Sequence, residues 1–245
     1  MKNKVTLLGY YGGDRTHALS AWQSTNIALD DFEHNKDINS RIQILYSETV
    51  KGKKRSTEDL LKMLASQSHH SPFEKSTLHF QISADIATHI HCLKHRIGIS
   101  INSESARYKE LENKRLIPDD WFDCDVENWD HPIFRIFNPD VESTWADVLD
   151  SYVKYGEILY HIACEQLTEK LGRKRAKESS RYFLTYAKQV DFDMMFNFRS
   201  FMHFQGLRNS SHAQKEVQEI AQMMLEQVRA IPDNPFEHSL DAFGY

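Results

Sequence analysis

The chain has 245 residues, of which 40% are hydrophobic and 27% charged, and its formal net charge is −5. This length allows one full-sized hydrophobic core or at most two small ones. The acidic balance argues against general nucleic-acid binding, although it leaves room for a local basic pocket. Because no apolar run is long enough for a membrane span or a signal peptide, we expect a cytoplasmic protein that does not bind membranes.

Apolar periodicity and turn signals predict five elements before residue 100. They are a short buried strand over 4–10, helices over 16–29, 56–68 and 84–95, and a half-buried strand over 76–83. Ser56, with Asp59 three residues later, is a capping signature for the second helix. In the third helix, Ile86, Ile90 and Leu93 fall on one face.

The second half of the chain reads as a loop followed by helices. Residues 112–142 are rich in Asp, Pro, Asn and Trp and predict a long loop that serves as an interface or an insertion. A long helix follows over 145–172 and stops at Gly172. The last helix opens with a capping box at Ser211 and Gln214, and its apolar positions are Val217, Ile220, Met224 and Val228. Strands thus cluster before residue 110 and helices after it, which predicts one α/β (α+β) domain over 1–245.

Three polar clusters are candidates for a ligand site. They are "HHSPFE" (69–74), "KHRIGISINSESARY" (94–108) and "NFRSFMHFQGLRNSSHAQKE" (197–216), with Arg181 upstream of the third. Their arginines suit bidentate recognition of phosphate or carboxylate. In "GLRNSSHAQ", a Gly bend before a helix N-terminus is expected to expose main-chain N–H groups to an anion. The alternative is that each Arg is an ordinary solvated surface charge.

Metal binding is the less favoured interpretation of the histidines. His89, His91 and His95 stand at i, i+2 and i+6, so they do not share one helix face, and no carboxylate lies nearby in the sequence. We therefore predict no metal site.

Covalent catalysis is also disfavoured. The three cysteines are far apart, without C-x-x-C spacing, and indicate no disulfide framework. Cys124 is flanked by two aspartates, which blunt a thiol, and Cys164 lies in an amphipathic helix, so Cys92 is the one acceptable nucleophile among them. Ser105 has no obvious general base. The polar stretch suits holding a substrate and a cofactor that carries out the difficult step.

The motifs are similar to those of a known family. Segment 94–108 resembles the signature of the flavin-dependent thymidylate synthases, which is Arg-His-Arg, seven or eight residues, Ser and an Arg two further on. Here it runs Lys94-His95-Arg96, eight residues, Ser105, Ala106 and Arg107. "HHSPFE" is similar to the family's His-x-Thr/Ser-Pro-Phe-Glu, "NFRS" and "LRNSSHAQ" to its Asn-x-Arg-Ser and Leu-Arg-x-x-x-His-Ala-Gln, and "LSAWQST" (19–25) to a motif of its first helix. The matches are colinear and cover most of the chain outside 112–175.

The resemblance implies an activity and an assembly. It implies a homotetramer with active sites at subunit interfaces, a small antiparallel or mixed sheet packed by helices, and bound FAD. The reaction would transfer a methylene from 5,10-methylenetetrahydrofolate to C5 of dUMP and reduce it to methyl, with NADPH recharging the flavin. None of the cysteines follows a Pro, which favours this route over the thymidylate synthases that use a Cys nucleophile next to Pro.

The resemblance also assigns residues to each ligand. It implies that dUMP is held by His91, Lys94, Glu104, Ser105, Ala106, Arg107, Arg181 and Arg208. It implies that FAD is held by Ser24, Ser71, Glu74, Lys94, His95, Arg96, Glu104, Asn197, Arg199, His203, Leu207 and His212. Arg208 or Arg181 would stabilise charge as C5 becomes nucleophilic, and Ser105 would position the substrate without forming a covalent bond.

Three positions depart from the family pattern. Lys94 replaces the first Arg of the signature, so a bidentate fork becomes a point charge. His91 stands where relatives often have Gln, and His203 where they often have Asn.

There are two alternatives to a thymidylate synthase. One is a related flavoenzyme that makes another C5-modified pyrimidine nucleotide, for example a hydroxymethyl product. The other is a non-catalytic nucleotide- or metal-binding protein.

Overall fold

The computed structural model describes residues 2–22, 37–127, 131–134 and 144–245. Its contacts divide the chain into two compact units. Unit 1 comprises Met1–Lys4, Ser83–Leu93 and Ser103–Phe192, and unit 2 comprises Val5–Ile82, Lys94–Asn102 and Asp193–Tyr245. The single domain over 1–245 stays a prediction.

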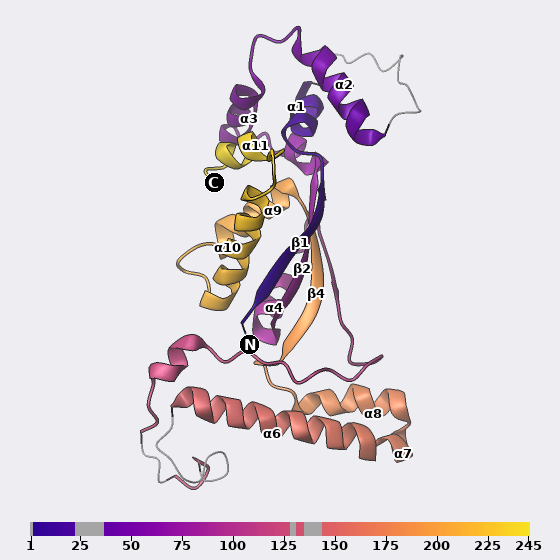
Figure 1. Ribbon diagram of the computed structural model, residues 1–245, viewed down its shortest axis with the longest axis vertical. Helices are drawn as coiled ribbons and strands as arrows, with labels where there is room; N and C mark the ends of the chain where they lie inside the picture. Colours follow the sequence, from indigo (N-terminus) through magenta and orange to yellow (C-terminus); the bar gives the residue numbers. More distant parts are fainter. Residues whose placement is uncertain (1, 23–36, 128–130, 135–143) are drawn as a thin grey trace. The chain divides into compact units, whose positions relative to one another are not determined.

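A four-stranded antiparallel sheet combines with helices, which confirms the predicted α/β (α+β) class (Figure 1). Its strands are β1 (Lys4–Tyr11), β2 (Thr77–Asp85), β3 (Ile99–Ser103) and β4 (Gln189–Asn197), in the order β1-β2-β4-β3. The expectation that strands cluster before residue 110 is wrong, because β4 pairs with both β2 and β3. In β4 the buried residues Val190, Phe192, Met194 and Phe196 alternate with more exposed ones.

Two predicted burial patterns are also wrong. Strand β1 is not buried, since Leu8 is 53% exposed and no residue of the strand is in the buried class. The physical reason is its place at the edge of the sheet, where one side has no neighbouring strand. Helix α4 (Ile86–Leu93) buries Thr88 and Cys92, whereas Leu93 on the predicted apolar face is exposed.

Unit 2 holds an aromatic core. Its helical segments are α1 (Asp14–Trp22), α2 (Ile38–Val50), α3 (Thr57–Ser66), η2 (Ser71–Lys75), α9 (Phe198–Arg208), α10 (Lys215–Arg229) and α11 (Glu237–Ala242). Phe80, Phe196, Phe201 and Phe204 are fully buried, and the rings of Phe80 and Phe201 stack with centroids 5.7 Å apart. These contacts fix the inner face of α9 and leave its outer face available for a ligand.

Helix boundaries in unit 2 follow the prediction in part. Ser56 caps α3 by accepting a hydrogen bond from Asp59 N at 3.1 Å, as predicted. The helix expected over 16–29 is seen as far as Trp22, and its remainder lies outside the described residues. The predicted core positions of α10 are fully buried. The capping box at Ser211 is wrong, because Gln214 is the N-cap and makes no capping side-chain bond.

Unit 1 is built around the long helix α6. Its helical segments are α4, η3 (Asp119–Asp123), α6 (Trp145–Gln166), α7 (Thr168–Leu171), α8 (Arg173–Ser180) and η4 (Arg181–Phe183). The helical stretch stops at Gly172, whose φ of +77° suits a glycine, as predicted. Tyr160 and Cys164 of α6 pack with Ala106 and Leu111 in a small core, so the buried face of this amphipathic helix includes Cys164. None of the helices in the described part of the chain has the length and apolarity that crossing a bilayer requires.

A buried polar chain joins α1, α11 and Ser76, the residue between η2 and β2, in unit 2. His17, which has no exposed surface, contacts Ser239 Oγ through Nδ1 at 2.8 Å and Ser76 Oγ through Nε2 at 2.6 Å. The Ser239 hydroxyl donates to the Asp14 carboxylate, which also accepts the main-chain N–H groups of His238 and Ser239 at 2.9 Å. Burial lowers the pKa of His17 to about 3 and raises the pKa of Asp14.

We expect the stability of the fold to fall as the pH is lowered. His17 stays neutral in the folded chain but takes up a proton near pH 6.5 when unfolded, so its contribution is complete above pH 6.5 and is lost toward pH 3. The loss for His17 alone is about 3 kcal/mol at pH 4. Asp14 acts in the opposite direction, because its raised pKa favours folding on the acid side.

Urea unfolding between pH 7 and pH 4.5 measures this dependence. The matched control is His17→Gln, which keeps a polar side chain but does not titrate. We expect a flatter dependence of the free energy of unfolding on pH in the variant, and equal slopes in the two proteins would contradict the role of His17.

Candidate active site

The segment that carries Lys94, His95 and Arg96 is held against the N-terminus of α9, within unit 2. Asn197 N donates to Gly98 O at 2.8 Å, and Ser200 Oγ donates to Ile97 O at 2.7 Å. The Asn197 side chain caps α9 by accepting from Ser200 N at 2.8 Å. One Asn and one Ser therefore both start the helix and hold the segment in place.

Gly98 makes this approach possible. Its φ is +65°, and a Cβ at this position would collide with the side chains of Asn197 and Ser200. The Gly bend predicted in "GLRNSSHAQ" is wrong, however, because Gly206 lies inside α9 and has no positive φ.

An arginine–histidine pair links α9 to the same segment. Arg208 Nε donates to His95 Nε2 at 2.9 Å, and the His95 ring packs on Phe204 with centroids 4.9 Å apart. Because Nε2 accepts this bond, the proton of neutral His95 must sit on Nδ1. Among the described residues, the two terminal nitrogens of Arg208 have no protein partner, so they are available to an anion or a carbonyl oxygen.

The outer face of α9 gathers three predicted flavin residues. Arg199, His203 and Leu207 stand at i, i+4 and i+8 and are all exposed. Arg199 Nη1 pairs with Glu74 Oε1 of η2 at 2.5 Å, with both side chains more than a third exposed. A cation, an imidazole and an apolar side chain on one face can meet the phosphates and the ring of a dinucleotide cofactor, so these residues fit FAD.

The other predicted FAD residues do not lie on the outer face of α9. Lys94 and Arg96 are exposed, Ser71 is the first residue of η2, and His212 lies exposed beyond the end of α9. Ser24 lies outside the described residues.

In unit 1, one glutamate gathers two of the predicted substrate arginines. Arg107 Nε donates to Glu178 Oε1 at 2.7 Å, and Arg181 Nε donates to the main-chain O of Glu178 at 3.1 Å. Both arginines are exposed. The Glu178 carboxylate pairs with Arg107, whereas Arg181 bonds only to a neutral main-chain carbonyl, so the two arginines keep an excess of positive charge that suits a phosphate. Sequence reasoning missed Glu178, which carries no signal beyond being one acid in a basic run.

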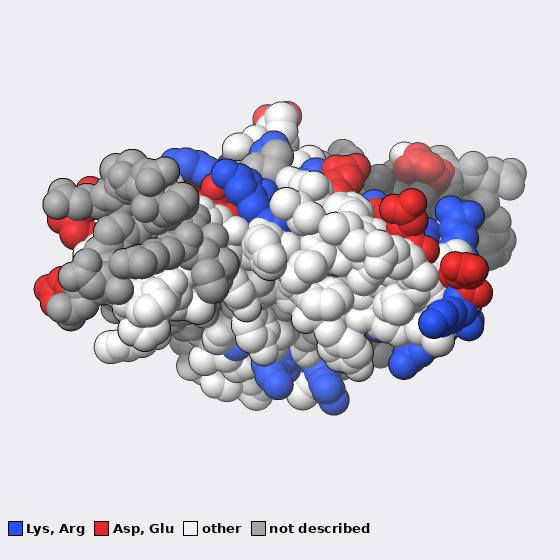
Figure 2. Space-filling model, turned by 90° about the horizontal axis from the view of Figure 1, so that it is seen from below, with Lys and Arg blue, Asp and Glu red and all other residues white. Residues whose placement is uncertain are grey.

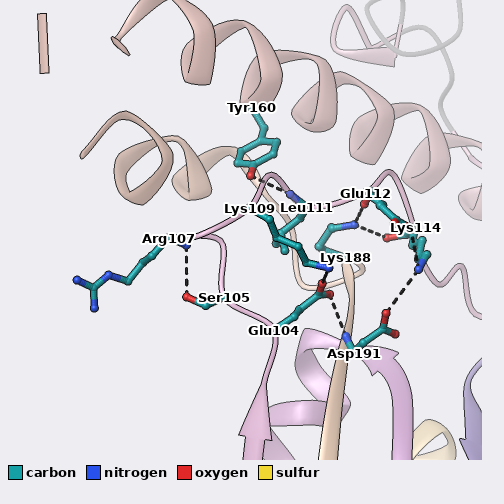
Figure 3. Close-up of polar contacts among 10 residues, drawn as sticks. All are labelled: Glu104, Ser105, Arg107, Lys109, Leu111, Glu112, Lys114, Tyr160, Lys188 and Asp191. Atoms are coloured by element: carbon teal, nitrogen blue, oxygen red, sulfur yellow. Dashed lines mark hydrogen bonds and ion pairs between the residues drawn. The ribbon is translucent and has the colours of Figure 1, made fainter. Parts of the chain in front are cut away.

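Glu104, Ser105 and Ala106 precede Arg107 in the signature, and their contacts limit what each can do for a ligand. Both carboxylate oxygens of Glu104 are engaged, one with Asp191 N at 2.9 Å and the other with Lys109 Nζ at 2.7 Å. Ser105 Oγ accepts from Arg107 N at 3.3 Å (Figure 3). Glu104 is therefore not a free general base for Ser105. The Ala106 side chain is buried, so a ligand can reach only its main chain.

His91 lies partly buried on α4, in unit 1. The neighbouring His89 bonds through Nε2 to Ser103 Oγ at 2.7 Å. In the part of the chain that the structure describes, no group of three or more His, Cys, Asp or Glu side chains is arranged to hold a metal ion.

The family follows from a sequence comparison. A family model described as "Thymidylate synthase complementing protein", Thy1, matches residues 6–232. The chain belongs to the Thy1 family. The resemblance of the sequence motifs is thereby confirmed.

Two curated relatives of this Thy1 chain are both named flavin-dependent thymidylate synthase. It is 29% identical over 179 residues to the flavin-dependent thymidylate synthase of Thermosipho africanus, covering 73% of this chain and 74% of the relative. It is 33% identical over 175 residues to that of Streptomyces avermitilis, covering 69% of each.

Solved structures match the fold of the Thy1 chain. Crystal structures of a UMP/dUMP methylase PolB from Streptomyces cacaoi, bound with 5-Br UMP and with 5-Br dUMP, each give a TM-score of 0.65 over 99% of this chain and 94% of that chain. At 22% sequence identity this likeness shows the fold alone.

Proposed function

We propose that the chain is a flavin-dependent thymidylate synthase that converts dUMP to dTMP, with 5,10-methylenetetrahydrofolate as one-carbon donor and NADPH as reductant. The observation that carries the proposal is the pair Arg107 and Arg181, gathered by Glu178 beside Ser105. The names of the curated relatives support it. So does the fold, which the chain shares with a UMP/dUMP methylase that binds 5-Br UMP and 5-Br dUMP.

Each set of residues has a task in this reaction. Arg107 and Arg181 would bind the phosphate of dUMP as bidentate donors. The outer face of α9, with Arg199, His203 and Leu207, would hold FAD together with the segment 94–98. The bound flavin would supply the hydride that reduces the transferred methylene to methyl.

Arg208 is the residue we assign to charge stabilisation. Negative charge develops on the uracil ring as C5 becomes nucleophilic. C5 would form a bond to the methylene carbon, the bonds from that carbon to the folate nitrogens would break and release tetrahydrofolate, and C5 would lose its proton. The free terminal nitrogens of Arg208 can donate to uracil O2, and the bond from Arg208 Nε to His95 fixes the orientation of the guanidinium. Ser105 positions the substrate and does not attack it.

The exposed apolar side of α6 supports the proposed homotetramer. Trp145, Tyr152, Tyr155, Ile158 and Ile162 are each more than 40% exposed. Seen from below, onto the side of unit 1 that carries α6, a broad area lacks Lys, Arg, Asp and Glu (Figure 2). An apolar surface of this kind favours burial against another chain. Cys92, Cys124 and Cys164 form no disulfide in the described part of the chain, which fits the proposed cytoplasmic location.

The absorption spectrum of the purified protein, loaded with FAD, tests the proposal. We expect a bound-flavin spectrum that shifts when dUMP is added, and product analysis that finds dTMP. Protein that stays colourless after incubation with FAD would contradict a flavoenzyme. A hydroxymethyl product, or turnover of UMP in place of dUMP, would support the related C5-modifying enzyme instead.

A further inference from the structure

Lys188 is a buried lysine immediately before β4, within unit 1. It is 2% exposed, although lysine is a residue that proteins rarely bury. Its ammonium donates to the main-chain carbonyl of Lys114 at 3.0 Å and to that of Glu112 (Figure 3). A single side chain thus binds two carbonyls of the segment that follows Arg107.

Main-chain bonds reinforce this attachment. Gln189 N donates to Lys114 O at 2.9 Å, and Leu116 N donates to Ala187 O at 2.8 Å. Arg115 and Lys188 form an antiparallel bridge. The end of the segment 104–116 is therefore fixed to the chain that leads into β4.

The beginning of the same segment is fixed to β4 itself. Glu104 N donates to Asp191 O at 2.8 Å, and the Glu104 carboxylate accepts from Asp191 N at 2.9 Å. Lys109 Nζ closes the turn on the other oxygen of Glu104 at 2.7 Å. Figure 3 shows Arg107 extending away from this cluster, on the part of the segment between the two attachments.

We propose that Lys188 is a positioning residue that sets Ser105 and Arg107 for the nucleotide by holding the end of the segment 104–116 at β4. The inference rests on the proposed function, since it takes Ser105 and Arg107 as substrate residues. The chemical reason for a lysine is the pair of carbonyls that its buried ammonium reaches, since a charged donor gives stronger hydrogen bonds than a neutral one. An apolar side chain of similar size would leave both carbonyls without the ammonium.

The charges around Lys188 agree with this role. Burial lowers the pKa of Lys188, while Glu157, Glu104 and Glu112 act to raise it and Lys114 acts to lower it. Arg115 in turn pairs with Glu157 at 2.7 Å. Three acids therefore face Lys188 and favour its charged form, in which all three N–H bonds are available.

The test compares Lys188→Met with wild type, each loaded with FAD. We expect the dissociation constant for dUMP, measured by titration calorimetry, and the KM for dUMP each to rise about tenfold or more, because the segment loses its fixed position. The flavin content and the KM for NADPH should stay unchanged, which a general loss of structure would not allow. A folded Lys188→Met protein whose dissociation constant for dUMP lies within about twofold of the wild-type value would overturn the proposal.

Lys177→Met is the matched control. Lys177 is also buried in unit 1, at 5% exposed, and no described residue of the segment 104–116 hydrogen-bonds to its side chain. It should leave the KM for dUMP unchanged. If Lys188→Met does not fold, Lys188→Gln decides, since its amide keeps the buried position polar but is shorter and uncharged and cannot replace the ammonium at both carbonyls: weaker dUMP binding supports the proposal and unchanged binding overturns it. Wild-type protein that binds no dUMP would refute the proposed function itself, and this inference with it.

Discussion

Replacing Arg208 by Ala should lower the turnover of dUMP by about a hundred- to a thousandfold. The change removes a donor aimed at charge that develops in the reaction, and such donors contribute this much in other enzymes. It also removes the bond to His95 Nε2, so the segment 94–98 loses one attachment to α9. Steady-state dTMP formation measures the effect, and a thermal melt checks that the fold survives.

Arg229→Ala is the control for Arg208→Ala. Arg229 is an exposed arginine in the last turn of α10, in the same unit. Its removal should change neither turnover nor dUMP affinity. Normal dTMP formation by Arg208→Ala would refute the role assigned to Arg208.

Replacing Gly98 by Ala should destabilise the protein by at least about 2 kcal/mol and weaken FAD binding. An L-residue at a φ of +65° costs about 1–2 kcal/mol, and loss of a helix cap costs about 1 kcal/mol more. The new Cβ would push the segment 94–98 away from Asn197 and Ser200. Urea unfolding and flavin titration measure the two effects.

Gly206→Ala is the matched control for the backbone. Gly206 lies inside α9 with open space around it, so Ala fits there and favours the helix by roughly 0.5–1 kcal/mol. The two Gly→Ala changes should therefore shift stability in opposite directions. A Gly98→Ala protein as stable as wild type, with normal FAD affinity, would mean that the segment does not depend on this glycine.

The elements with strong local signals were predictable, and those shaped by tertiary contacts were not. Ser56 and the apolar face of α10 were recognised because caps and helical periodicity are local. Strand β4 was not predicted although its buried residues alternate, because the adjacent Met194 and Met195 blur the period of two and the aromatic-rich run continues without a break into α9. The edge position of β1 and the buried side of α4 depend on their neighbours in space, which periodicity alone does not reveal.

The candidate site shows the same division. The motifs located Arg107, Arg181 and Arg208 by residue type and spacing, and these residues have the exposure and hydrogen-bonding capacity that an anion needs. The shared helix face of Arg199, His203 and Leu207 was not predicted, because a Gly bend was expected at Gly206, inside what is helix α9. Glu178 and Lys188 were missed, because a single acid or a single lysine in a polar stretch gives no hint of what it will contact.

In the free protein, the Glu178 carboxylate already pairs with Arg107, where the nucleotide phosphate is proposed to bind. A phosphate that accepts from Arg107 Nε must displace the Glu178 carboxylate, which already accepts from that nitrogen at 2.7 Å. The observed affinity is then the difference between two ion pairs, an external one gained and an internal one given up. Such an exchange is less sensitive to salt than the capture of a phosphate by two bare arginines, since the total number of paired charges changes little. It also rejects weak anions, because a ligand has to compete with an acid that never leaves the chain.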